Sequence, residues 1–432
     1  MKFKIFYLIY LIISLIITGL ILYKSEIIWD GLRRSYYLKF YIISFFLPLI
    51  SLFLSKSIKQ IIVITFFSFL ITSYFFEFYL TSIKQDKNIE LKTIILKETT
   101  GKIYDKKTRK EKYNELKKKG NKVTLSLFPE YWVFKKNKNI FPLSGISNID
   151  TILCSDEGTH QIFKSDKYGF RNNNNVWDKK KVDYVIVGDS FAQGFCVDES
   201  DHIASHINRI TNKNVINLAY GSNGPLIEFA SIREYLPENT KNLIWFYFEG
   251  NDLDNLDNEL KNSFLNQYLF NEKFSQNLKN KHNEIDKKIN KEINKTLGFI
   301  NTIIVFLKLT KTRKIYLNLS KKNTKKLERS TNNLDKLFLI LNKTKKILDT
   351  NNIKFYFVYL PEFDRYNSDY NNQNYEKIIN YLSKNKIELI DVHKEIFSKT
   401  NNPKKFFVFE KDGHYNKHGY LLISEKIIEI SK

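Results

Sequence analysis

The chain has 432 residues, and its 69 Lys and Arg outnumber its 46 Asp and Glu, which gives a formal charge of +23. With 43% hydrophobic residues there is ample material for a core, so a wholly disordered chain is excluded. Two cysteines exclude a disulfide-rich scaffold and a four-cysteine zinc site. Because the Lys residues are spread along the whole chain together with Asn and Ile, we attribute the charge to compositional bias and expect no nucleic-acid partner.

Three apolar runs near the N-terminus predict membrane-spanning helices. They are Ile5 to Tyr23, Phe40 to Ser55, and Gln60 to Phe76, which Glu77 follows. A bilayer core of about 30 Å requires about 20 residues of apolar helix, and flanking Lys and Tyr can complete shorter runs. The alternatives are a signal peptide for the first run and buried core helices for the others. No small-residue cleavage site follows Tyr23, so residues 1–82 are expected to form a three-helix anchor in a lipid bilayer.

The orientation of this anchor does not follow from charge. Equal numbers of Lys and Arg flank the apolar runs on the two sides, and the Lys-rich stretch after Ile83 favours the cytoplasm only slightly. Long domains cross membranes largely regardless of their charge.

Residues 83–180 are expected to form a polar lead-in segment that packs on the domain after it. Its first part, with Lys117-Lys118-Lys119, is typical of a solvated helix, and contact with anionic headgroups is the alternative. Turn residues follow at Phe141-Pro142-Leu143-Ser144-Gly145 and at Tyr168-Gly169-Phe170-Arg171.

From residue 181 onwards, predicted strands alternate with helices. The strands are Asp183–Val187, Asn214–Leu218, Asn242–Phe248, Lys354–Leu360 and Ile387–Ile390. Near-continuous apolar strands separated by helices predict an α/β fold, with a parallel sheet covered on both faces. Functional groups in such sheets lie beyond the carboxyl ends of the strands. The first three strands all end in Gly accompanied by Ser, Asn or Asp, so a site is expected there.

Residues 253–349 predict a helical insertion between the third and fourth strands, because apolar residues such as Leu260, Phe264 and Tyr268 recur at helical spacing. The run from Leu297 to Leu307 is apolar enough to contact a membrane or a partner, although packing on its own domain is the expected arrangement. An amphipathic helix reaching Ile430 closes the chain.

Four short motifs follow one another along residues 183–432. They are Gly188-Asp189-Ser190, the turn Gly221-Ser222-Asn223-Gly224, Gly250-Asn251-Asp252 and Asp412-Gly413-His414. In this order they resemble the blocks of the SGNH (GDSL) hydrolase superfamily. The resemblance implies a flavodoxin-like, three-layer α/β/α domain over residues 181–432. Residues 142–173 also look like the segment that precedes this domain in bacterial membrane-anchored members associated with envelope polysaccharides.

The motifs carry the chemistry of a serine hydrolase. A Ser hydroxyl needs an adjacent base, and the imidazole of that base needs a third group to hold its tautomer. Ser190 would attack an ester carbonyl, His414 would take its proton, and Asp412 would orient His414. The donors for the oxyanion would be the Ser190 N–H, a backbone N–H at Gly221 or Ser222, and the Asn251 amide.

Each assignment has a structural alternative. Ser190 and Asn251 could only cap helices, and His393 or His418 could stand in for His414. Ser222 occupies a position where many superfamily members carry Gly, which leaves open which N–H of residues 221–224 is the donor. Glu249 also replaces a usual Gly, and it could narrow the site or add a carboxylate to it.

The two cysteines bear on location. If Cys154 and Cys196 pair, they tie the lead-in segment to the loop after Ser190, and a stable disulfide implies an oxidising compartment such as the periplasm. Two unrelated buried thiols are the alternative. No Walker loop, dinucleotide fingerprint, zinc motif or EF-hand occurs in the sequence, so no cofactor and no metal are expected.

These features together predict a membrane-anchored esterase or O-acyltransferase of the cytoplasmic membrane, with a periplasmic or extracellular catalytic domain. The resemblance alone supplies its partners, which are an acylated envelope carbohydrate and a membrane protein that donates the acyl group. The alternative is a non-catalytic, membrane-anchored protein that binds glycans or assembles polysaccharides and keeps the fold.

Overall fold

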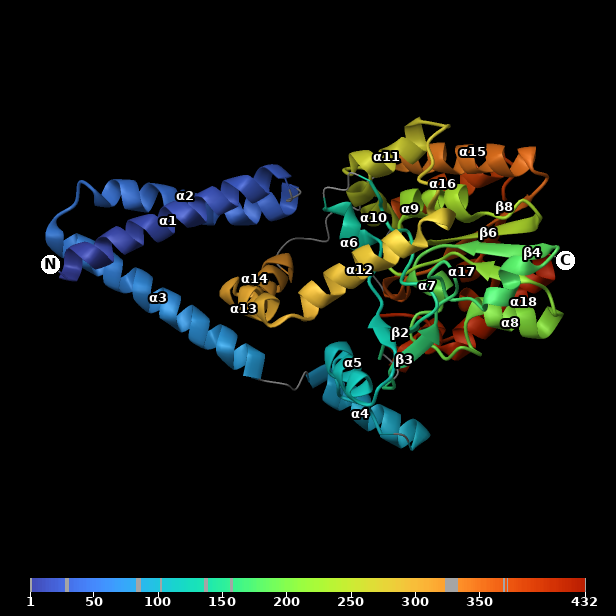
Figure 1. Cartoon of the computed structure of the whole chain (residues 1–432), viewed down its shortest axis with the longest axis horizontal. Helices are drawn as coiled ribbons and strands as arrows, with labels where there is room; N and C mark the ends of the chain where they lie inside the picture. The colour runs from blue at the N-terminus through green and yellow to red at the C-terminus, as the bar shows by residue number, and fades with distance from the viewer. Residues whose placement is uncertain are drawn as a thin grey trace. The chain divides into compact units, whose positions relative to one another are not determined.

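The computed structural model describes residues 2–27, 31–82, 87–101, 103–135, 139–155, 158–322, 333–367, 370 and 372–431 (Figure 1). The chain divides into two compact units. The first comprises residues 1–84 and 299–325, and the second comprises residues 85–298 and 326–432. Residues 299–325, which belong to the predicted insertion, therefore fall in the first unit.

Long apolar helices dominate the first unit. They are α1 (Lys2–Ile27), α2 (Gly31–Ser51) and α3 (Lys56–Ser82), to which α13 (Phe299–Leu307) and α14 (Thr310–Lys322) are added. Two segments, Phe3–Tyr23 and Lys56–Ser82, are long and apolar enough to cross a membrane, by length and composition. The second predicted span gives a shorter apolar segment, Tyr37–Ser51, within α2. Hydroxyl pairs join α1 to α2, with Thr18 Oγ1 lying 2.9 Å from Ser44 Oγ.

The second unit begins with two helices and a small sheet. Its elements are α4 (Lys87–Thr100), α5 (Arg109–Lys118), β1 (Val123–Leu125), α6 (Glu130–Val133), β2 (Asp150–Cys154), β3 (Gln161–Lys164) and η1 (Asn174–Asp178). Thr108 and Glu111 form a capping box that starts α5. The sheet has the order β1-β2-β3, with a parallel and an antiparallel pair. This sheet was not predicted, because strands of three to five residues are too short to show a clear alternation in the sequence.

A five-stranded, wholly parallel sheet forms the centre of the second unit. Its strands are β4 (Val182–Val187), β5 (Val215–Asn217), β6 (Thr240–Phe248), β7 (Lys354–Leu360) and β8 (Glu388–Asp391). The order β5-β4-β6-β7-β8 corresponds to the flavodoxin-like order 2-1-3-4-5. The predicted α/β fold with a parallel sheet is therefore confirmed, and the ends of the predicted strands lie within two residues of the observed ones.

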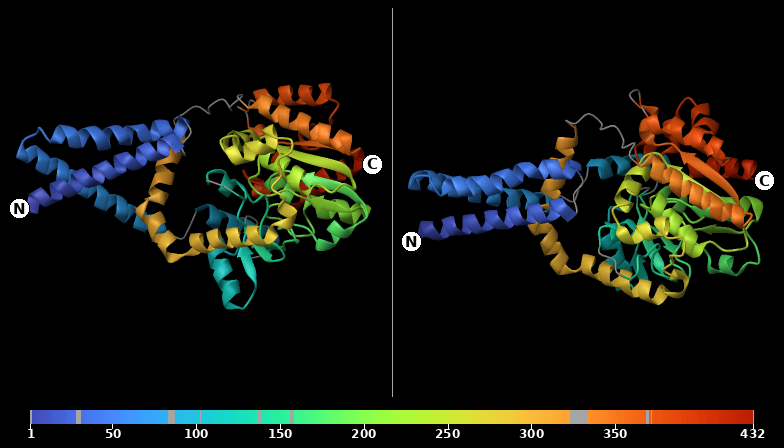
Figure 2. Two further views of the ribbon diagram at one scale, coloured as in Figure 1. Left: turned by 45° about the horizontal axis from the view of Figure 1, so that its top comes forward. Right: turned by 90° about the horizontal axis from the view of Figure 1, so that it is seen from above.

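Helices cover both faces of this sheet, as Figures 1 and 2 show. Along β4, Val185 and Val187 face a core that includes α9 (Pro225–Tyr235) and α15 (Leu334–Thr350). The alternate residues Tyr184 and Ile186 face a second core, built with α8 (Ile203–Thr211) and α18 (Lys417–Ile430). Two buried faces explain why the strands read as continuous apolar runs.

The remaining elements lie around this sheet. They are α7 (Ser190–Gln193), α10 (Asp252–Glu259), α11 (Ser263–Phe270), η2 (Leu278–Asn280), α12 (His282–Leu297), η3 (Phe363–Tyr366), α16 (Gln373–Lys384), α17 (Val392–Glu395), η4 (Phe397–Lys399), η5 (Pro403–Phe406) and η6 (Val408–Glu410). Helix α12 buries Ile285, Ile289 and Ile293, which are spaced four residues apart on one face.

Candidate active site

Ser190 follows a tight turn at the carboxyl end of β4. Gly188 has φ of 152°, and a Cβ at this position would lie 2.7 Å from the Ala192 Cβ, so the turn requires glycine. Asp189 caps α7 by accepting the Phe191 N–H at 2.9 Å. These contacts hold Ser190 as the first residue of α7, with 9% of its surface exposed.

His414 lies against Ser190 even though 224 residues separate the two in sequence. The His414 Nε2 is 2.9 Å from the Ser190 Oγ. Its ring lies near the rings of Phe191 and Phe195, at centroid distances of 4.8 and 4.6 Å. The structure therefore brings the predicted nucleophile and the predicted base within hydrogen-bond reach.

The two alternative histidines have other neighbours. The His393 Nδ1 is 3.2 Å from the Tyr366 hydroxyl. His418 is exposed, with its ring 5.7 Å from that of Phe406. Of these three, only His414 makes a hydrogen bond with Ser190 among the described residues.

Asp412 does not contact His414 through its carboxylate. Its side chain is exposed, and no hydrogen bond or ion pair within the described part of the chain involves it. Gly413, between the two residues, has φ of 151°, a conformation that favours glycine. The orienting role of Asp412 stays a prediction.

A different carboxylate, that of Asp189, lies beside Ser190. Its Oδ2 is 3.4 Å from the Ser190 Oγ. Burial raises the pKa of Asp189 to about 6. The opposing effects, which lower this pKa, come from hydrogen bonds with the Phe191 N–H, Ser190 and the Asn251 amide and from the charge of His414. Asp189 and Asn251 therefore lie close to each other and to Ser190.

The turn after β5 leaves one backbone donor unused. The Gly221 N–H donates to the Gln193 Oε1 at 2.9 Å, the Asn223 N–H to the Tyr220 carbonyl at 3.2 Å, and the Gly224 N–H to the Glu259 Oε1 at 2.6 Å. The Ser222 N–H forms no hydrogen bond with any described residue. Of the two candidates from the sequence, Gly221 is thus engaged and Ser222 is available. The Ser190 N–H is likewise unbonded within the described ranges.

Asn251 precedes α10 but does not cap it with its side chain. The Asn251 Oδ1 is buried and has no hydrogen-bond partner among the described residues. The alternative of a simple helix cap is therefore not what the structure shows for Asn251.

Glu249 is held by other residues and offers no spare carboxylate. It makes a bidentate ion pair with Arg365, with Arg365 Nε at 2.7 Å from Oε1. It also accepts the Tyr359 hydroxyl and the Glu362 N–H, both at 2.9 Å. Burial acts to raise the pKa of Glu249, but hydrogen bonding and charge from Arg365 outweigh burial and lower it. The replacement of the usual Gly thus fastens the end of β6 to the chain after β7.

Besides Asp252 of the third motif, buried carboxyl groups that the sequence did not indicate interact with this region. Burial, and then repulsion from neighbouring acids including Asp189, raises the pKa of Glu228 and of Asp252 well above their ordinary values. Burial also raises the pKa of Glu259 to about 8. Glu228 and Glu259 are separated from the motifs in sequence, so no sequence signal identified them.

The lead-in segment packs against the loop that follows Ser190. Cys154 on β2 and Cys196 form a disulfide, with their Cα atoms 5.5 Å apart. The Arg171 guanidinium is buried and donates to the carbonyls of Gly194 at 2.6 Å and Val197 at 3.0 Å. Phe128 packs 6.0 Å from Phe195, which in turn packs on His414. Arg171 and Phe128 therefore support the site, although only Arg171 lay in a motif that the sequence analysis noted.

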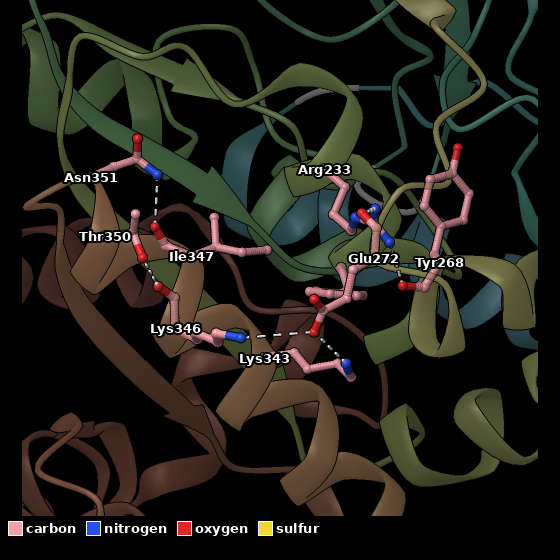
Figure 3. Close-up of a pocket in the computed structure, with 9 residues that line it drawn as sticks. Arg233, Tyr268, Glu272, Lys343, Lys346, Ile347, Thr350 and Asn351 are labelled. Atoms are coloured by element: carbon pink, nitrogen blue, oxygen red, sulfur yellow. Dashed lines mark hydrogen bonds and ion pairs between the residues drawn. The ribbon is translucent and has the colours of Figure 1, made fainter.

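A cavity of about 240 Å³ lies elsewhere in the second unit (Figure 3). It is lined by Phe229, Arg233, Tyr268, Glu272, Lys343, Lys346, Ile347, Thr350 and Asn351. None of these is a predicted site residue, and the Arg233 guanidinium is occupied by the carbonyls of Tyr268, Asn271, Glu272 and Phe274.

Within the described ranges, no group of three or more His, Cys, Asp or Glu could hold a metal ion.

Among known proteins, the chain is similar to several solved structures. No family model matches the chain, and no curated protein matches it. One similar structure is described as a lipolytic protein of the G-D-S-L family from Desulfitobacterium hafniense, with 13% identity and a TM-score of 0.32 over 58% of this chain and 99% of that one. Another is described as an acylhydrolase from Bacteroides fragilis, with 13% identity and a TM-score of 0.31 over 60% of this chain and 92% of that one. The first description names the superfamily that the motifs resemble, but both likenesses are too weak to transfer an activity.

Proposed function

We propose that the protein is a membrane-anchored serine esterase or O-acyltransferase of the SGNH type, which acts on acyl esters, foremost acetyl esters, of an envelope carbohydrate. The observation that carries this proposal is the 2.9 Å contact between Ser190 Oγ and His414 Nε2. It lies beyond the carboxyl end of β4 in a parallel sheet, where such folds place their sites.

Acylation of the enzyme would begin at Ser190. The Ser190 Oγ attacks the ester carbonyl while its proton passes to the His414 Nε2. The tetrahedral oxyanion accepts hydrogen bonds from the Ser190 N–H, the Ser222 N–H and the Asn251 amide. The C–O bond to the leaving alcohol then breaks, His414 returns the proton to that alcohol, and the acyl group stays on Ser190.

The second half of the reaction decides between hydrolysis and transfer. His414 takes a proton from water or from a sugar hydroxyl, whose oxygen attacks the acyl-Ser190 carbonyl. The bond between the acyl carbon and the Ser190 Oγ then breaks, and His414 returns the proton to the Ser190 Oγ. Attack by water releases the free acid, and attack by a sugar hydroxyl yields a new ester. Both routes use the same residues.

The location rests on separate observations. Two apolar helices support anchoring in the cytoplasmic membrane. The Cys154–Cys196 disulfide supports an oxidising compartment for the catalytic domain, which is the periplasm or the cell exterior. The carbohydrate substrate and a membrane protein that donates the acyl group rest on the resemblance of the motifs.

A non-catalytic protein that binds or assembles glycans is the second candidate. The observation that favours it is the exposed Asp412, because a side chain that makes no hydrogen bond or ion pair within the described ranges does not support the orienting role predicted for it. Such a protein would keep its cellular role after loss of the Ser190 hydroxyl.

Labelling with a fluorophosphonate probe tests the proposal. The full chain in detergent is treated with the probe, and the adduct is measured by intact mass for wild type, Ser190→Ala, His414→Ala and the matched control His418→Ala. We expect a single adduct on wild type and His418→Ala and none on the other two. Folded wild type that takes no label would overturn the activated serine and leave the binding protein as the better account.

A further inference from the structure

Helix α13, within the predicted insertion, is apolar along its whole length and yet exposed. Its nine residues carry no charge. Phe299 and Ile300 are 78% and 73% exposed, and none of the α13 side chains is buried. An uncharged helix with this much exposed apolar surface needs a partner that removes it from water.

Helices α13 and α14 pack on α3, more than 200 residues away in sequence. The Tyr74 hydroxyl of α3 donates to the Leu307 carbonyl at 2.9 Å. The rings of Tyr74 and Phe306 lie 5.7 Å apart. These contacts make α13 and α14 part of the unit that holds the candidate membrane spans.

Glu77 fixes this arrangement. It is the acidic residue near the end of the third apolar run, and it is only 1% exposed. Its carboxylate accepts the N–H groups of Lys311 at 3.0 Å and Thr312 at 2.8 Å, at the start of α14. A helix N-terminus is a favourable partner for a buried carboxylate, which explains a charge in an otherwise apolar helix.

The charges next to α13 match a membrane surface. Helix α14 contains no acidic residue, and its first turns carry Lys311, Arg313 and Lys314. An apolar helix beside a basic one is typical of elements that insert at the boundary of acyl chains and anionic headgroups. On α3, which Tyr74 joins to α13, Phe75 and Phe78 are also largely exposed, so the candidate span carries exposed apolar surface of its own.

The length and connections of α13 fit insertion from one side. Nine residues of helix extend about 14 Å, less than half of the ~30 Å apolar core of a bilayer. The chain enters α13 from the second unit and returns to it after α14. Lys311 Nζ donates to the Leu80 carbonyl, near the C-terminal end of α3. The chain also continues into the second unit after that end of α3.

We propose that α13 is embedded in the same leaflet of the bilayer as the C-terminal end of α3, with the basic residues of α14 at anionic phospholipid headgroups. The inference rests on the membrane anchoring proposed above. The chain passes between the units after residues 84, 298 and 325, so this element gives the catalytic unit two further tethers to the membrane besides the one after α3.

Depth-dependent quenching tests this arrangement in the full chain. Ile300→Cys is labelled with an environment-sensitive fluorophore and reconstituted into vesicles of phosphatidylcholine and phosphatidylglycerol. Phe69→Cys, exposed in the middle of α3, is the lipid-facing control, and Ser383→Cys, exposed on α16, is the aqueous control. Non-specific attachment of the fluorophore is measured with the wild type, whose two cysteines are paired. If Ile300→Cys does not fold, the probe is attached at Ile303→Cys instead.

We expect the Ile300 probe to be quenched by nitroxide lipids and protected from iodide, with stronger quenching from a nitroxide high on the acyl chain than from one at the midplane. The Phe69 probe should show the reverse depth preference. Iodide quenching at Ile300 equal to that at Ser383 would overturn the inference, as would protection from both quenchers, which would indicate a second copy or another protein. If the Phe69 probe also avoids lipid, the anchoring proposal itself fails.

Discussion

The Gln193 Oε1 accepts the backbone N–H of Gly221 at 2.9 Å, and this bond engages one of the two backbone donors that the sequence predicts for the turn after β5. Gln193 lies three residues after Ser190 on the same short helix, so the turn after β5 is fastened directly to the nucleophile helix. With Gly221, Asn223 and Gly224 engaged, the Ser222 N–H is the backbone group of this turn that remains available among the described residues.

This assignment predicts unequal effects of two substitutions. Asn251→Ala removes a side-chain donor, and loss of one oxyanion donor lowers turnover by about 10²–10³-fold. Ser222→Gly keeps its N–H and suits the φ of 60° at this position, so its activity should stay within about twofold of wild type. The rate of hydrolysis of an activated acetyl ester measures both. A large loss in Ser222→Gly would show that its side chain, and not its N–H, matters.

The exposed position of Asp412 predicts that it contributes less than His414. Even if the exposed Asp412 carboxylate pairs with a charged His414 during the reaction, an exposed charge pair is worth about 1 kcal/mol or less. Asp412→Asn should therefore slow fluorophosphonate labelling by no more than about fivefold. His414→Ala removes the base and should slow it by orders of magnitude. The measurement is the labelling rate constant of each variant. Equal losses would restore the triad predicted from the sequence and would require the loop at Gly413 to change conformation.

The ion pair between Glu249 and Arg365 predicts a loss of stability without a loss of chemistry. The Glu249 side chain is fully buried, so Arg365→Met leaves an unpaired buried carboxylate and should lower the free energy of unfolding by about 3–5 kcal/mol. Adding Glu249→Gln should recover part of this loss, because the buried charge is then gone. Denaturant unfolding measures both variants. If Glu249→Gln alone abolishes labelling of Ser190, the carboxylate belongs to the site.

The strands and their polar ends could be predicted because each is a local pattern. In Lys354–Leu360 six consecutive apolar residues follow one Lys, and the observed β7 has the same bounds. The contact of Ser190 with His414 was predicted only through the order of the motifs, since nothing in the composition indicates that these two residues meet.

Contacts between distant segments could not be predicted from the sequence. Glu249 was noted as unusual, but its partner Arg365 lies 116 residues away and carries no local signal. Glu77 likewise interrupts an apolar run for a reason that lies at Lys311 and Thr312, more than 230 residues later. Residues 299–325 fall in the first unit, whereas packing on its own domain was the expected arrangement for the run from Leu297 to Leu307.

The partly buried His282 predicts a pH dependence of stability. Burial lowers the pKa of His282 to about 4, while an unfolded His has a pKa of about 6.5. Between these values the unfolded chain binds more protons, so the contribution of His282 is present above pH ~6.5 and is lost as the pH falls towards ~4. The loss amounts to about 3 kcal/mol at most, since one pKa unit corresponds to ~1.4 kcal/mol.

Melting temperatures of the full chain between pH 4 and 7 measure this effect. We expect His282→Gln to show a shallower decline with falling pH than wild type, while His418→Gln, at an exposed site, follows the wild type. Parallel curves for wild type and His282→Gln would show that this histidine does not contribute to the pH dependence.

The disulfide predicts both the stability and the location of the catalytic unit. Cys154 and Cys196 close a loop across 42 positions, which in the chain-entropy estimate stabilises the fold by about 3–4 kcal/mol. Reduction should therefore lower the denaturant midpoint, and the double variant Cys154→Ser/Cys196→Ser should match the reduced protein and stop responding to reductant. Alkylation before and after reduction, applied to protein from its native membrane, counts the free thiols. Two reactive thiols before reduction would contradict the pairing and remove the support for a periplasmic or extracellular catalytic domain, because a disulfide of this kind persists only in an oxidising compartment.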